Sequence, residues 1–91
     1  SGGNVVKMAA ELSLYPLDGP LEKTVWGFIE KLIDDNSVTV ATNSMSTQII
    51  GDSADVFRVI KTALESSYAE FGRQVLVAKF IPEHVTEIGA T

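Results

Sequence analysis

The strongest constraint on the fold is the hydrophobic period, which changes from strand-like to helical and back along the chain. Residues 5–15 alternate, so one face of a strand would carry Val6, Met8, Ala10, Leu12 and Leu14. Residues 21–33 then repeat apolar side chains at helical spacing, and Pro20 suits the start of that helix. The Asp18-Gly19-Pro20 turn separates the two segments.

The same order of strand-like and helical spacing returns in the second half of the chain. Residues 37–42 and 45–50 favour strands, and Asn43-Ser44 between them predicts a hairpin turn or bulge. Helical spacing resumes over residues 56–71, where Asp52 or Ser53 can cap the helix and Gly72 suits its end. Residues 74–81 form a last strand that Pro82 closes.

This order predicts one α+β domain over residues 1–91, of the ferredoxin-like split βαβ (β-α-β-β-α-β) class. Right-handed crossovers put both helices on the same face of a four-stranded antiparallel sheet. The open face would present Glu11, Ser13 and Tyr15. Because a sheet face of this size needs cover, we expect a homodimer or homotetramer.

Charge and residue content exclude several functions. Seven Lys and Arg against twelve Asp and Glu give a net charge of −5, which disfavours binding to nucleic acid or to anionic membranes. There is no Cys, and the single histidine, His84, lies in a polar tail where we expect it to be exposed. Asp34-Asp35 is typical of a solvated helix end. We therefore expect no enzyme, no metal site and no cofactor.

The expected location is the cytoplasm. No apolar run approaches the length of a membrane helix, and the segment Ser1-Gly2-Gly3-Asn4 lacks the basic and apolar regions of a signal peptide.

Two polar clusters are the candidate functional residues. One is Ser13-Leu14-Tyr15-Pro16-Leu17, and the other spans residues 42–47. Turn chemistry alone would explain both. Alternatively, their hydroxyl and amide groups could hydrogen-bond a small heterocycle on which Tyr15, Trp26 or a phenylalanine stacks. Trp26 and Phe28 also fit plain core packing.

The same residues resemble the YkoF-related family, which includes single-domain thiamine-binding proteins. The similarity rests on Ser13-Leu14-Tyr15-Pro16 and on Thr42-Asn43-Ser44-Met45-Ser46-Thr47 followed by Gly51, and it extends over residues 7–82. It implies a ferredoxin-like fold that binds thiamine, or its hydroxymethylpyrimidine half, without chemistry. The site residues that it implies are Ser13, Tyr15, Thr42, Asn43, Ser46 and Thr47.

One position departs from the family pattern. Asn43 and Ser44 stand where YkoF has acidic residues, and Glu11 on the neighbouring strand is the candidate replacement. Since neither cluster contains Lys or Arg, we expect a neutral or cationic ligand rather than a phosphate ester, with only Arg73 and Lys79 able to approach. The alternative is an ACT-like regulatory or structural module that binds another metabolite or only protein partners.

Overall fold

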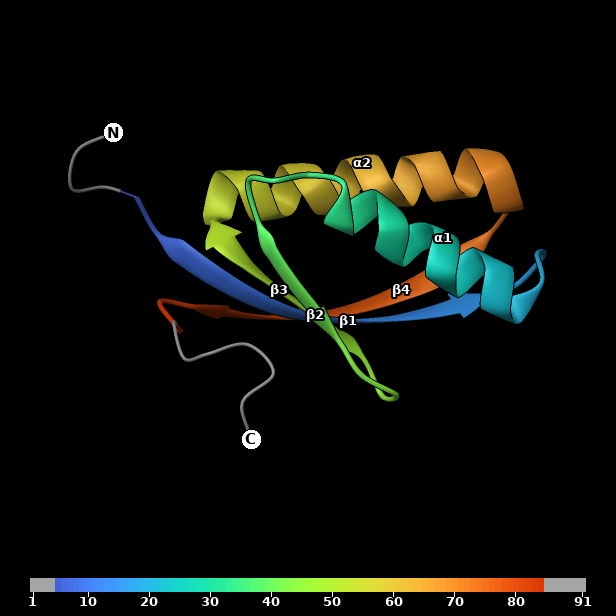
Figure 1. Cartoon of the computed structure of the whole chain (residues 1–91), viewed down its shortest axis with the longest axis horizontal. Coiled ribbons are helices and arrows are strands. Elements are labelled where there is room, and N and C mark those ends of the chain that lie inside the picture. The colour runs from blue at the N-terminus through green and yellow to red at the C-terminus, as the bar shows by residue number, and fades with distance from the viewer. Residues whose placement is uncertain (1–4, 85–91) are drawn as a thin grey trace.

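The computed structural model describes residues 5–84, which form four strands and two helices (Figure 1). In chain order they are β1 (Lys7–Pro16), α1 (Leu21–Ile33), β2 (Thr39–Thr42), β3 (Thr47–Asp52), α2 (Ser53–Phe71) and β4 (Gln74–Pro82). The strands pair antiparallel in the order β2-β3-β1-β4. Both helices lie over one face of this sheet. The predicted ferredoxin-like α+β class is confirmed.

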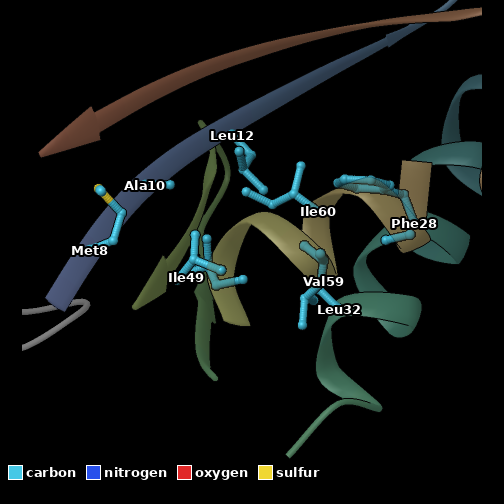
Figure 2. Packing of buried hydrophobic residues seen from close by; sticks show 10 residues of the cluster. Met8, Ala10, Leu12, Phe28, Leu32, Ile49, Val59 and Ile60 are labelled. Carbon is cyan, nitrogen blue, oxygen red and sulfur yellow. The ribbon is translucent and has the colours of Figure 1, made fainter. Parts of the chain in front are cut away.

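The hydrophobic core fills the space between the sheet and the two helices (Figure 2). The alternation of β1 turns Met8, Ala10 and Leu12 towards the helices, as predicted. Phe28 and Leu32 of α1 pack there together with the apolar stripe of α2. Burying large apolar side chains contributes about 1.5–3 kcal/mol each, so this single layer supplies most of the stability of the fold.

The helix boundaries follow the predicted residues, with one correction. Pro20 precedes α1, and Gly72 ends α2 with φ of 87°, a left-handed conformation that glycine adopts without strain. Asp52 does occupy the cap position of α2, but its side chain makes no capping hydrogen bond. Its carboxylate lies 2.8 Å from the Lys7 ammonium instead, because the register places these two residues opposite each other.

The open face of the sheet is partly apolar, and the charged side chains of its strands are paired. Its β1 residues include Glu11, Ser13 and Tyr15, as predicted, because they alternate with the core residues. Val75, Val77 and Ile81 of β4 lie on the same face and are each about half exposed. The charges there form two pairs: Lys7 with Asp52, and Lys79 with Glu11 at 3.7 Å.

Across residues 5–84, no helix combines the length and the apolar character needed to cross a membrane. His84, at the end of the described chain, is exposed, as predicted.

Candidate functional site

A pocket of about 290 Å³ lies between the end of β1, the first turns of α1 and the hairpin that joins β2 to β3. Its floor includes the buried side chains of Leu12 and Phe28, and its rim includes exposed side chains of the hairpin. This volume is at the lower end of the range found for small-molecule sites.

The pocket exists because β1 is longer than its pairing with β3. β1 pairs with β4 as far as Pro16, but with β3 only as far as Leu12. From Ser13 onwards, one edge of β1 is therefore not paired with β3. Beside this stretch of β1, the hairpin projects away from the sheet (Figure 1). The start of α1 forms the remaining wall of the pocket.

The structure brings the two polar clusters together around this one pocket. Its lining includes all six residues named from the sequence: Ser13, Tyr15, Thr42, Asn43, Ser46 and Thr47. The clusters are 25 or more positions apart in sequence, and the pairing of Leu12 with Thr47 is what makes them neighbours. Their role in binding stays a prediction.

Two of these residues form a hydroxyl pair at the base of the hairpin. Thr42 Oγ1 and Thr47 Oγ1 are 3.1 Å apart across the last rung of the β2–β3 ladder. A hydroxyl has one hydrogen to donate and two lone pairs to accept. One hydrogen joins the pair, so the other hydroxyl hydrogen is not used by this bond. The pair can therefore both donate to and accept from a ligand.

Asn43 holds the hairpin tip in shape. Its side-chain oxygen accepts hydrogen bonds from the backbone N–H groups of Met45, at 2.7 Å, and Ser46, at 3.0 Å. Its own backbone N–H donates to the carbonyl oxygen of Ser46. This arrangement is the turn chemistry that favours asparagine at such positions. Asn43 therefore shapes the pocket wall, and the turn interpretation of this residue and the binding interpretation are compatible.

Glu11 does not line the pocket, although it was the candidate replacement for the acidic residues of the family. Its carboxylate lies on the open face of the sheet, where it accepts a 3.0 Å hydrogen bond from Ser46 Oγ and pairs with Lys79. Ser46 and Thr47 are adjacent in the chain, so their side chains point to opposite faces, and Thr47 is buried towards the helices. Glu11 thus stabilises the hairpin through Ser46, from the open face of the sheet.

Exposed aromatic and aliphatic side chains form the apolar wall of the pocket. Trp26 is 56% exposed, and Met45 at the hairpin tip is 84% exposed, whereas the side chain of Tyr15 alternates to the open face of the sheet. Plain core packing is wrong for Trp26 and right for Phe28, which is only 2% exposed. The two side chains lie on different sides of α1 because two residues turn a helix by more than half a circle.

Glu22 is a pocket residue that the sequence reasoning missed. It lies in the first turn of α1 and lines the pocket together with Leu21 and Trp26. The signal that could have revealed it is the spacing of four residues between Glu22 and Trp26, which places both on the same face of a helix.

The two basic residues considered for phosphate binding lie elsewhere. Arg73 is engaged by Asp18, and Lys79 faces Glu11 on the open face. Neither is among the residues that line the pocket, and no other Lys or Arg of the described chain is. Nor do three or more His, Asp or Glu side chains gather as a metal site anywhere between residues 5 and 84.

Asp18 fixes the loop that leads from β1 to α1. Its carboxylate accepts hydrogen bonds from the Arg73 backbone N–H at 2.8 Å and from the guanidinium at 3.1 and 3.0 Å. Gly72 lets the chain come this close, because a Cβ there would lie 2.8 Å from the Asp18 Cβ. The hydrogen bonds from Arg73 hold the pKa of Asp18 below its usual value. The loop that carries Leu17 and leads into α1 is thereby tied to the start of β4.

A pH dependence follows from this depressed pKa. The contribution of Asp18 to stability is present above the pKa that it has in the unfolded chain, about 3.9, and is lost as the pH falls through the lower folded value. We expect Asp18→Asn to lower the urea midpoint at pH 7 and to differ less from the parent at pH 3. Asp34→Asn, which removes an exposed carboxylate at the end of α1, is the matched control and should cause no loss at pH 7. Equal losses at both pH values would contradict the role of the ion pair.

Known proteins share this fold. No protein-family model matches the chain, and no curated protein matches it. A hypothetical protein from Methanocaldococcus jannascii is 28% identical, with a TM-score of 0.73 over 89% of this chain and 84% of its own length. A Thermotoga maritima protein for which a role in thiamine biosynthesis or salvage has been put forward is 20% identical, with a TM-score of 0.71 and 81% of each chain covered. A domain of unknown function, DUF77, from Bacillus cereus is 16% identical, with a TM-score of 0.67 over 97% of this chain and 86% of its own. These similarities show the fold.

Proposed function

We propose that the pocket binds thiamine or its hydroxymethylpyrimidine half and that the protein performs no chemistry on it. The observation that carries the proposal is the convergence of the two polar clusters on one pocket with an aromatic wall. The resemblance of these clusters to the YkoF-related family and the fold shared with the Thermotoga maritima protein support the same ligand.

The pocket offers what an aminopyrimidine ring requires. Such a ring both donates and accepts hydrogen bonds, and the Thr42–Thr47 hydroxyl pair can do both. The ring faces are apolar, and the exposed face of Trp26 provides a stacking surface. The unpaired edge of β1 beyond Leu12 adds backbone groups at the same place.

Binding without reaction is the function that this lining favours. A catalytic site needs a nucleophile or base held by a partner within hydrogen-bond distance. The hydroxyls of Thr42 and Thr47 are held by one another, and that of Ser46 by a carboxylate on the far side of the sheet. Transport, storage and sensing all use such a site.

Among the described residues, no basic side chain lines the pocket, and this feature provides a test of the proposed ligand. We expect thiamine to bind more tightly than thiamine diphosphate, because the diphosphate would enter a pocket without Lys or Arg in a protein of net charge −5. Calorimetric titration of both compounds in one buffer measures the difference. A diphosphate that binds tenfold more tightly would overturn the assignment. Failure of thiamine and hydroxymethylpyrimidine alike would favour an ACT-like module with another ligand.

We further propose that a second copy of the chain covers the open face of the sheet. Val75, Val77 and Ile81 give this face an apolar row, and the charged side chains of its strands form two ion pairs. Two copies of an acidic protein can therefore meet there without strong repulsion.

Sedimentation equilibrium at micromolar concentration tests this association. We expect a dimer or tetramer for the parent and a smaller species for Val77→Glu, which puts an unpaired charge into the apolar row of β4. Ser66→Glu, on the exposed side of α2, is the matched control and should leave the mass unchanged. A parent that sediments only as a 9.8 kDa species contradicts the proposal.

A further inference from the structure

We propose that Glu22 makes the pocket selective for ligands that carry a positive charge, and that it does so by acting together with the indole face of Trp26. This inference deepens the proposed function and rests on it, because it assigns the chemical class of ligand that the same pocket prefers.

Glu22 is the single charged residue among those that line the pocket, within the described chain. The other acidic residues nearest to the pocket are neutralised: Glu11 by Lys79 and Asp18 by Arg73. No Lys or Arg between residues 5 and 84 lies within ion-pair distance of the Glu22 carboxylate. A ligand in the pocket therefore meets one negative charge that the described part of the protein does not balance.

Trp26 follows Glu22 by one turn of α1, so both side chains lie on the helix face that borders the pocket. An aromatic face attracts a cation through its quadrupole, and indole does so more strongly than the other aromatic side chains. A carboxylate and an indole on one wall favour a ring or an ammonium group that is positively charged. A neutral ring on the same wall makes only a stacking contact.

A pair of ligands that differ in charge and not in shape tests this assignment. In thiamine the thiazolium ring is a permanent cation, whereas in 3-deazathiamine a neutral thiophene replaces it. We expect the parent to prefer thiamine, and Glu22→Gln to weaken thiamine binding about three- to tenfold while it changes 3-deazathiamine binding by less than about twofold. The preference of the parent should also shrink as salt is added.

Asp34→Asn is the matched control, because Asp34 is an exposed carboxylate at the end of the same helix, two turns beyond Trp26, and does not line the pocket. It changes the net charge of the protein by the same amount as Glu22→Gln. Thiamine affinity that falls equally in both variants would show a general charge effect and would overturn the proposal. Equal loss of thiamine and 3-deazathiamine in Glu22→Gln would overturn it too, because it would mean a lost contact and not a lost charge.

A second measurement needs no assumption about thiamine. Trp26 is the single tryptophan of the chain, so tryptophan fluorescence reports on this pocket. Quenching by the cation N-methylpyridinium is compared with quenching by neutral acrylamide. We expect the ratio of the two quenching constants to fall about twofold in Glu22→Gln and to stay at the parental value in Asp34→Asn.

The two measurements separate the inference from the proposed function. If thiamine does not bind and the quenching ratio falls in Glu22→Gln, the ligand assignment fails and the selectivity for cations stands. If thiamine binds with the same affinity to the parent and to Glu22→Gln and the quenching ratio is unchanged, the ligand assignment stands and the role of Glu22 fails.

Discussion

Phe28→Ala is expected to destabilise the protein by about 3–5 kcal/mol, the range found when a buried phenylalanine is truncated. Phe28 of α1 is 2% exposed and packs in the core with residues of α2 and the sheet, so its truncation leaves a cavity there (Figure 2). A domain of this size has a total stability of only about 5–10 kcal/mol. The loss would therefore remove a large part of the folding free energy.

Urea denaturation followed by circular dichroism measures this loss. If Phe28→Ala does not fold, Phe28→Leu keeps the test open, because it retains most of the volume and should cost about 1–1.5 kcal/mol. A cost below about 1 kcal/mol for the alanine variant would mean that Phe28 is not part of the core.

Trp26→Ala is expected to have the opposite profile: nearly unchanged stability and a large loss of ligand affinity. The indole is 56% exposed, so its removal should change the stability by no more than about 0.5 kcal/mol. Loss of a stacking face for a cationic ring should cost about 1–2 kcal/mol, or about 5- to 30-fold in affinity.

Calorimetric titration with thiamine measures the affinity of this variant without relying on tryptophan fluorescence. Trp26→Phe is the control, since it keeps an aromatic face and should retain more of the affinity than alanine. If Trp26→Ala binds thiamine as the parent does, the ligand does not occupy the pocket beside α1.

Phe28 and Trp26 also mark how far the sequence could predict the structure. The change from alternating to helical spacing was sufficient for the order of the elements, because each period buries one face of one element. The polar clusters could be joined into one site because consecutive strands of a hairpin, and the strand beside them, are neighbours in this topology. These inferences need only local spacing and connectivity.

The side of α1 that borders the pocket could not be predicted in this way. Trp26 and Phe28 are both apolar residues of one helix, and their spacing does not say where the sheet below the helix ends. That limit depends on β1 pairing with β3 only as far as Leu12 and on how α1 crosses the sheet, which tertiary packing decides. Glu22 was missed for the same reason.

β1 pairs further along its length with β4 than with β3. This difference divides the pocket into residues that can be exchanged without harm to the fold and residues that cannot. The floor is shared with the core, so substitutions at Leu12 or Phe28 change folding and binding together. The hairpin tip contributes exposed side chains such as Asn43, Ser44 and Met45, which support no core packing. Related chains could therefore acquire different ligands through changes of length or sequence in this tip alone, while the sheet and helices stay as they are.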